Sequence, residues 1–360
     1  MSASAKVTDD VLRELARICG SENVITEPLR LARYGRDQVP ETRYHAAPDV
    51  VVQPGAAAEV QQVARLANRE LIPLTPRGAG TGLSGGAIPV HGGICLSLER
   101  MNRILEIDTD DLVAVVEPGV ITNRLDEELR PYGLFFAGYP LSEEICFIGG
   151  NVAHNAGGGR AVKYGVTKRY VTGLDVVTAT GELLSLGGKR FKDVTGYDLV
   201  SLMVGSEGTL GIFTKITIRL LPRPTHRATL LALFDDMAAA LAAVSDMLSK
   251  AGVVPSSAEL MDRTCFQEAC RAMKETIPFE KAGAVLLLES DGRAAGPVQE
   301  EMAVLEAVCR RNGARELMRA ASEAEAAHYW KIRKQVPWVV RRLASRTSIE
   351  DIVVPVGCVG

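Results

Sequence analysis

The most constraining feature of the sequence is the stretch PRGAGTGLSGG at residues 76–86, which places five glycines in eleven positions. It follows the apolar run LIPL at 71–74, which predicts a short strand. A glycine-rich loop after a strand lets backbone N–H groups approach a phosphate without interference from side chains. Taken alone, the stretch is equally compatible with a close-packed turn that holds no ligand.

The loop departs from two common nucleotide-binding motifs. A P-loop requires a lysine that this stretch lacks. The dinucleotide fingerprint of a nicotinamide-dependent Rossmann enzyme requires a helix directly after the loop, and residues 83–90 have no helical periodicity. Both classes are therefore disfavoured.

Two further glycine-rich stretches change the interpretation. They are FIGGNVAHNAGGGRAVKYG at 147–165 and GSEGTLGIFTKI at 205–216. Three such loops, separated by β-rich sequence, predict one extended ligand held at several points. A dinucleotide has the right size.

Charge and cysteine content exclude several other classes. The net charge of -3 gives no electrostatic case for nucleic acid or an anionic membrane. The seven cysteines are odd in number and form no C-x-x-C, which argues against a disulfide framework, an iron–sulfur cluster or a structural zinc site. The five histidines show no metal-ligand spacing, so no metal site is expected. Without a signal peptide or a long apolar run, we expect a cytoplasmic protein, with peripheral attachment to the inner face of a membrane left open.

Hydrophobic periodicity predicts two domains in the 360 residues. We expect an N-terminal helical segment over 1–47 that packs on a first domain at 48–223, and a second α/β domain over 224–360, divided at the proline-rich LPRPT. In the first part the predicted strands are 50–52, 71–74, 94–98, 104–107, 112–116, 173–179 and 208–222, with helices at 8–19, 56–70 and 121–130. In the second part the predicted strands are 229–234, 257–260, 284–289 and 350–354, with helices at 237–250, 262–274, 297–311 and 322–336.

Five strings carry a specific resemblance to a known family: PRGAGTGLSGG, IGGNVAHNAGG, KYGVTKRYVTGLDVV, FKDVTGYDL and GSEGTLGI, in that order between about 48 and 222. By these strings the chain resembles the FAD-linked D-2-hydroxy acid dehydrogenases and oxidases, which have the FAD-binding fold of the vanillyl-alcohol-oxidase type. The resemblance implies an α+β protein. Its FAD-binding domain would have two α+β subdomains, followed by a ferredoxin-like α/β cap domain that we expect to be incomplete at its C-terminal end.

The resemblance also implies which residues hold noncovalent FAD. The first loop would bind the pyrophosphate, largely through backbone N–H groups. The second loop passes along the ribityl and isoalloxazine parts, and the third lies by the adenosine. Relatives with covalent flavin often carry a histidine where this chain has Thr81. The implied residues are Arg77, Gly78, Ala79, Gly80, Thr81, Gly82, Gly149, Gly150, Asn151, Ala156, Gly157, Gly158, Glu207, Gly208 and Ile212.

Other polar residues allow both a functional and a structural interpretation. Arg333, in HYWKIRKQ, matches the family arginine that grips the substrate carboxylate, a task for which a guanidinium is well suited. It could equally be a surface arginine of a basic helix. Asp193, Thr195 and Asp198 are expected to cap a helix near 198 and to fix the preceding loop. His154 is expected to serve in local packing or at the surface rather than to face the flavin.

The implied reaction moves a hydride from the α-carbon of a small D-2-hydroxy acid to FAD. Electrons then pass to a separate acceptor: a quinone, a cytochrome, an electron-transfer flavoprotein or an iron–sulfur subunit. The family motifs H-x-G-D-G-N-x-H and G-E-H-G, which supply metal ligands and a catalytic base, are absent, so the catalytic residues remain unknown. The alternative is therefore a catalytically incomplete FAD-binding fragment or subunit. The KDVTGYDL string argues against an NADPH-dependent reductase or an alkyl-transfer synthase of the same fold.

Overall fold

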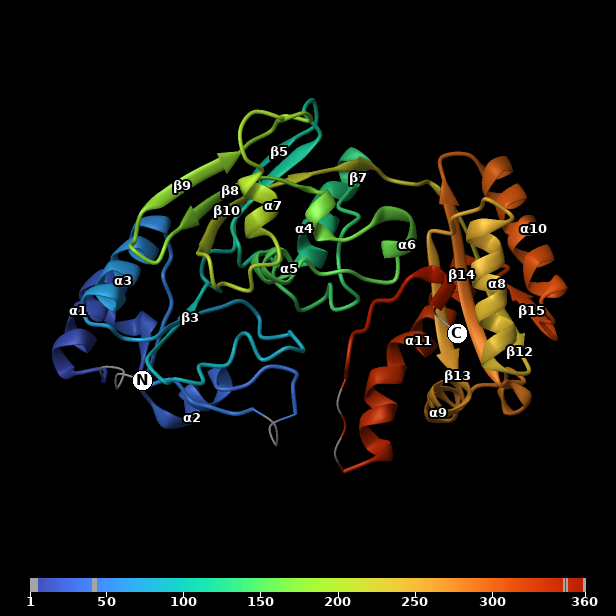
Figure 1. Cartoon of the computed structure of the whole chain (residues 1–360), viewed down its shortest axis with the longest axis horizontal. Helices are drawn as coiled ribbons and strands as arrows, with labels where there is room; N and C mark the ends of the chain where they lie inside the picture. The colour runs from blue at the N-terminus through green and yellow to red at the C-terminus, as the bar shows by residue number, and fades with distance from the viewer. Residues whose placement is uncertain (1–5, 41–43, 346, 348, 359–360) are drawn as a thin grey trace. The chain divides into compact units, whose positions relative to one another are not determined.

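The structure is a computed structural model that describes residues 6–40, 44–345, 347 and 349–358. Its contacts divide the chain into two compact units (Figure 1). Unit 1 comprises Met1–Gly158 and Val166–Pro222, and unit 2 comprises Gly159–Gly165 and Arg223–Gly360. The short segment 159–165 thus belongs to unit 2, although both of its neighbours in sequence belong to unit 1.

Unit 1 contains two sheets. The first has the order β1-β2-β4-β3, with β1 at Val24–Ile25, β2 at Val50–Val52, β4 at Ile94–Ser97 and β3 at Leu74–Arg77. The strands β2, β4 and β3 are parallel, because helix α3 (Ala57–Arg69) crosses between β2 and β3. Helix α1 (Asp9–Cys19) is capped by Thr8 and packs with α3 over a shared apolar core. A short helix, α2, spans Pro28–Leu31.

The second sheet of unit 1 is antiparallel. Its order is β5-β6-β10-β8-β9, with β5 at Ile104–Asp108, β6 at Val113–Val116, β10 at Ile212–Arg219, β8 at Val171–Val177 and β9 at Leu183–Gly187. A two-stranded ladder joins β7 (Leu134–Phe135) to β11 (Leu221–Pro222). The helices of this part are α4 (Thr122–Leu129), α5 (Ile148–His154) and α7 (Leu199–Met203).

Unit 2 is built on one antiparallel sheet of order β13-β14-β12-β15. The strands are β12 (His226–Phe234), β13 (Ser257–Asp262), β14 (Ala284–Gly292) and β15 (Glu316–Arg319), an order typical of a ferredoxin-like sheet. Side chains of β14 alternate between two cores: Leu286 and Leu288 pack under α8 (Met237–Ser249) and α10 (Ala295–Arg311), and Leu287 packs under α9 (Arg263–Met273) and α11 (Glu323–Leu343). Covering both faces explains why the first five residues of β14 form a continuous apolar run.

Three predicted strands differ from the structure. The strand expected at 71–74 lies at Leu74–Arg77, because Leu71 has a positive φ of 54° and the chain is still closing the end of α3 there. The strand expected at 208–222 is interrupted, and its regular parts are β10 and β11. Residues 350–354 form no strand. Ile352 and Val353 are exposed there. The strand is absent because residues that favour β-structure form a strand only where a neighbouring strand accepts their hydrogen bonds.

In the described part of the chain, no helix is both long and apolar enough to cross a lipid bilayer.

Candidate cofactor site

The first glycine-rich loop leaves strand β3 at Arg77. The backbone N–H groups of residues 78–82 have no hydrogen-bond acceptor among the residues that the structure describes. Gly80 has a positive φ of 70°, and a Cβ there would overlap the Arg77 guanidinium. Arg77 is buried and donates to the carbonyl of Ala87 at 3.1 Å. Arg77 therefore braces the loop from within, and the N–H groups are what the loop can offer a ligand.

A second segment fixes this loop from outside. The N–H of Gln38 donates to the carbonyl of Gly82 at 3.0 Å, and the Asp37 carboxylate accepts from the N–H of Gly85 at 2.9 Å. Both contacts engage the rim of the loop. Earlier in the loop, Ala79 and Thr81 are half-buried.

The second loop begins in helix α5, directly beside the first. A Cβ on Gly78 would lie 3.6 Å from the nitrogen of Gly150, so the two glycine backbones face each other. Gly149 packs against Pro118, where a Cβ would meet the Pro118 carbonyl oxygen at 3.0 Å. The Asn151 side chain is buried and donates to Thr122 Oγ1 at 2.7 Å. Asn151 thus anchors α5 to α4, and its side chain is already committed inside the protein.

The end of the second loop is also close-packed. Asn155 ends α5 in the left-handed region, and the N–H of Ala156 donates to the carbonyl of Asn151 at 2.9 Å. Gly157 is exposed, whereas a Cβ on Gly158 would overlap the carbonyl oxygen of Tyr139. A side chain at 158 would therefore force the loop away from its place.

The third loop meets both of the others. The N–H of Glu207 donates to the carbonyl of Ala153 at 2.9 Å, and a Cβ on Gly86 would lie 3.5 Å from Glu207 Oε2. Glu207 adopts a positive φ of 52° and Gly208 lies against Pro76. Unit 1 therefore brings the three loops together around a surface made largely of backbone.

Ile212, which the resemblance implies, and His154, which is expected to serve in local packing or at the surface, lie beside these loops. Ile212 opens β10 with its side chain in the apolar core, so only its backbone can meet a ligand. His154 lies between the loops, with Nε2 3.2 Å from the Cβ position of Gly82. That position suits local packing.

The loop that precedes α7 is only partly explained by capping. Asp198 is the N-cap of α7 and accepts from the N–H of Ser201 at 2.9 Å, as expected. Asp193 instead pairs with Arg190 at 2.6 Å. Val194 and Tyr197 are exposed. Hydrogen bonding to Ser201 lowers the pKa of Asp198.

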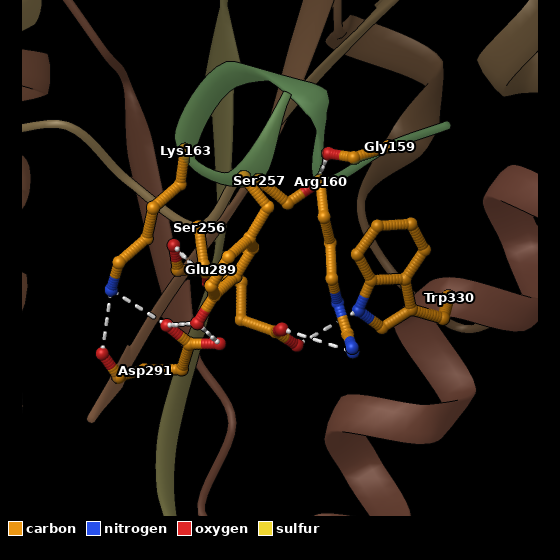
Figure 2. A network of polar contacts seen from close by, with 9 residues as sticks. Gly159, Arg160, Lys163, Ser256, Ser257, Glu289, Asp291 and Trp330 are labelled. Carbon is orange, nitrogen blue, oxygen red and sulfur yellow. Dashed lines mark hydrogen bonds and ion pairs between the residues drawn. The ribbon is translucent and has the colours of Figure 1, made fainter. Parts of the chain in front are cut away.

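Unit 2 contains a separate group of charged and polar side chains, which we call the β13–β14 cluster: Arg160, Lys163, Tyr164, Ser257, Glu259, Glu289, Asp291, Trp330 and Arg333. Figure 2 shows most of it, with side chains from segment 159–165 directed toward β13 and β14. Arg333 lies on α11 and donates from Nε to Glu259 Oε2 at 2.6 Å, which places it in this cluster.

The carboxylate of Asp291 anchors segment 159–165, which includes helix α6 (Ala161–Tyr164). Its side chain is fully buried, and it accepts from Lys163 Nζ at 2.7 Å and from the Tyr164 hydroxyl at 2.8 Å. Burial, together with the Asp291 charge, raises the pKa of Tyr164 above its ordinary value. Trp330 Nε1 donates to Glu289 Oε2 at 3.2 Å.

Sequence reasoning missed Glu259, Glu289 and Asp291. The signal for two of them was present, because the apolar run of β14 is interrupted by the acidic residues of LLLESDG. Acidic residues are rarely buried unless they are paired. In the described ranges, no group of three or more His, Cys, Asp or Glu side chains is arranged to hold a metal ion.

This fold and this loop arrangement are those of an FAD-linked oxidoreductase. Residues 48–187 match the family described as "FAD binding domain", and residues 223–359 match "FAD linked oxidases, C-terminal domain". The chain belongs to this family of FAD-linked oxidoreductases, and FAD is the cofactor of its N-terminal domain. The assignment made from the five strings is confirmed, as is the α+β fold with a cap domain.

Within the family, the chain is similar to several named enzymes. It is 39% identical to a glycolate oxidase subunit GlcD of Bacillus subtilis (strain 168), over 97% of this chain and 73% of the relative. It is 32% identical to a D-lactate dehydrogenase of Anaerostipes hadrus, over 97% and 74%. It is 33% identical to a D-2-hydroxyglutarate dehydrogenase of Xanthomonas citri pv. viticola, over 93% and 70%. The chain spans only 62% of the glycolate oxidase subunit GlcD of Escherichia coli (strain K12).

Solved structures show the same fold at lower identity. An alkyldihydroxyacetonephosphate synthase matches with a TM-score of 0.77 and 20% identity, over 95% of this chain and 65% of that chain. A p-cresol methylhydroxylase matches with a TM-score of 0.73 and 19% identity, over 90% and 68%. These likenesses concern the fold alone.

Proposed function

We propose that the protein is an FAD-dependent dehydrogenase of small D-2-hydroxy acids that holds its flavin noncovalently. When bound, FAD supplies an acceptor for the hydride from the α-carbon, while the hydroxyl loses a proton and the substrate becomes a 2-oxo acid. The observation that carries the proposal is the meeting of three glycine-rich loops in unit 1, with the N–H groups of residues 78–82 unoccupied by acceptors in the described part of the chain.

Each loop has a distinct task in this proposal. The N–H groups of 78–82 hold the pyrophosphate, since adjacent backbone donors suit an anion. Residues 149–151 and 156–158 run along the ribityl chain and the ring, with Gly149 and Gly158 needed for close backbone packing. Glu207, Gly208 and the backbone of Ile212 lie by the adenosine. Thr81, which cannot bond covalently to flavin as a histidine does, keeps the cofactor exchangeable.

In this proposal, Arg333 of unit 2 binds the substrate carboxylate. Its Nε is used by Glu259, whereas Nη1 and Nη2 have no partner among the described residues. Two parallel N–H donors match a planar carboxylate. The names of the relatives, D-lactate dehydrogenase and D-2-hydroxyglutarate dehydrogenase, support a 2-hydroxy acid. We further propose that 48–223 acts as the FAD-binding domain and 224–360 as the substrate domain.

Electrons leave for a separate acceptor, because the resemblance covers a flavin domain and a cap domain and includes no second redox centre. A quinone, a cytochrome, an electron-transfer flavoprotein or an iron–sulfur subunit would serve. We place the protein in the cytoplasm or peripherally on the inner face of a membrane.

The test is the visible spectrum of the purified chain, followed by anaerobic addition of D-lactate, D-2-hydroxyglutarate or glycolate. Flavin bands that bleach with D-lactate, and that stay unchanged with L-lactate as the matched control, support the dehydrogenase. A folded protein that binds no FAD refutes the cofactor assignment. Bound flavin that stays oxidised with all three acids refutes the reaction and supports a flavin-binding fragment or subunit.

A further inference from the structure

We propose that Glu259 is a positioning residue for the substrate-binding arginine: it holds Arg333 by Nε so that the Nη1–Nη2 edge faces outward to receive a carboxylate. The inference rests on the proposed function of Arg333 and extends it. Nothing in the sequence pattern indicated a partner for this arginine.

The geometry of the pair is the first argument. Glu259 Oε2 accepts from Arg333 Nε at 2.6 Å, and no second hydrogen bond joins the two side chains. A side-on pair would use both Nε and Nη2 and would occupy one donor edge of the guanidinium. In the observed pair, the described residues leave both Nη groups unused. A substrate carboxylate can therefore bind the outer edge without displacing Glu259.

Burial is the second argument. The Arg333 side chain retains 21% of its exposed area and Glu259 retains 15%. A hydrogen bond to a charged group under such cover fixes the guanidinium plane, whereas an exposed pair would be screened and mobile. In the proposal, the part of Arg333 that remains exposed is its Nη1–Nη2 edge, which a small anion can reach.

The surroundings of Glu259 show that its own position is fixed. Oε1 of Glu259 lies 3.1 Å from where a Cβ of Gly159 would stand, and the Trp330 ring lies at the same distance. Ser257, two residues before Glu259 on the same face of β13, donates from its hydroxyl to the carbonyl of Gly159. The carboxylate is thus confined between β13, Gly159 and Trp330, and a side chain at position 159 would contact it closely.

A positioning role and a simple charge effect have opposite signs. Glu259 is negative, so its removal leaves Arg333 with a stronger positive potential. Coulomb attraction alone then predicts tighter binding of an anion by an E259A variant. If Glu259 instead orients Arg333, E259A binds the anion more weakly because the guanidinium loses its fixed plane. The sign of the change therefore separates the two effects.

The experiment titrates pyruvate, a 2-oxo acid that cannot reduce flavin, into the FAD-loaded chain by calorimetry. We expect Glu259→Ala to weaken pyruvate binding about tenfold. Glu259→Gln, which keeps an oxygen that can accept from Nε, should stay within about threefold of the parent chain. Arg333→Met should lose at least as much affinity as Glu259→Ala. Glu268→Ala, which breaks an exposed pair with Arg271 on α9, is the matched control and should change nothing.

FAD affinity and the thermal unfolding midpoint of each variant are measured beside the titration. Unchanged values with weaker pyruvate binding support positioning, and a parallel loss of all three shows a structural role and overturns it. Should Glu259→Ala fail to bind FAD, Glu259→Asp gives the same comparison, because the shorter side chain keeps its charge but withdraws from Nε. Wild-type affinity in Glu259→Asp then overturns the proposal.

The outcomes separate this inference from the function on which it rests. If Arg333→Met weakens pyruvate binding while Glu259→Ala leaves it unchanged or tightens it, only the positioning role fails. If the parent chain binds FAD but shows no pyruvate binding, or if Arg333→Met binds pyruvate normally, the substrate role of Arg333 fails and the inference fails with it.

Discussion

Two adjacent glycines in helix α5 give a direct test of where the flavin binds. A Cβ on Gly149 would lie 2.6 Å from Pro118 Cβ and 3.0 Å from the Pro118 carbonyl oxygen, a backbone atom that cannot move easily. A Cβ on Gly150 would meet nothing within 4 Å. The same substitution at neighbouring positions therefore meets protein in one case and open space in the other.

The two positions lead to opposite effects on the stability of the FAD-free chain. Gly150→Ala should gain about 0.5–1 kcal/mol, because alanine loses less backbone entropy than glycine in a helix. Gly149→Ala should lose about 1–3 kcal/mol, since overpacking against Pro118 exceeds the same gain. Neither glycine has a positive φ, so no backbone strain obscures the comparison.

For FAD affinity, Gly150 is the informative position. If the flavin passes over Gly150, the added methyl occupies ligand space, and we expect binding at least about tenfold weaker, which corresponds to about 1.4 kcal/mol. Urea unfolding of the FAD-free variants gives the stabilities, and quenching of flavin fluorescence gives the affinities. A Gly150→Ala variant that is stable and binds FAD as the parent chain does would refute the proposed course of the second loop.

Three further predictions concern buried groups. Asp291→Ala should destabilise unit 2 by about 3 kcal/mol in urea unfolding, because it removes the fully buried carboxylate to which Lys163 and Tyr164 donate, and Glu268→Ala should cost no more than about 1 kcal/mol; equal effects would contradict the role of Asp291. A thiol reagent at pH 8 should react fast with the exposed Cys358 alone, since burial raises the pKa of cysteines such as Cys95 to about 12, and a second fast thiol would contradict this burial. Tyr164 keeps its proton in the folded state above pH 10, where an unfolded tyrosine loses it, so stability should fall as the pH rises past 10. This fall should be smaller in Tyr164→Phe, and an identical pH profile would count against the contact with Asp291.

Local pattern was sufficient for most elements of the fold. Strand β2 was predicted at its observed bounds, and the prediction of Thr8 as an N-cap was confirmed, because apolar periodicity and capping are properties of neighbouring residues. The shift of β3 to Leu74–Arg77 escaped prediction, since it depends on how α3 ends at Leu71. The missing strand at 350–354 shows the same limit, because a ladder partner is a tertiary property.

The candidate site divides in the same way. Glycine-rich sequence indicates a close approach of the backbone, so the three loops around Gly80, Gly150 and Gly208 could be predicted from the sequence. The partners of Arg333 could not, because Glu259 lies 74 residues away and nothing in its own neighbourhood marks it. Membership of segment 159–165 in unit 2 was hidden for the same reason.

That membership has a consequence for how the molecule is made. Lys163 is synthesised 128 residues before its partner Asp291. Segment 159–165 can therefore take its place in unit 2 only after strand β14 has been made. A chain that began at Arg223 would bury Asp291 without its counter-ion. The second unit is therefore compact in the fold but discontinuous in the gene. Recombination at the Pro222–Arg223 junction would separate a carboxylate from the lysine that neutralises it.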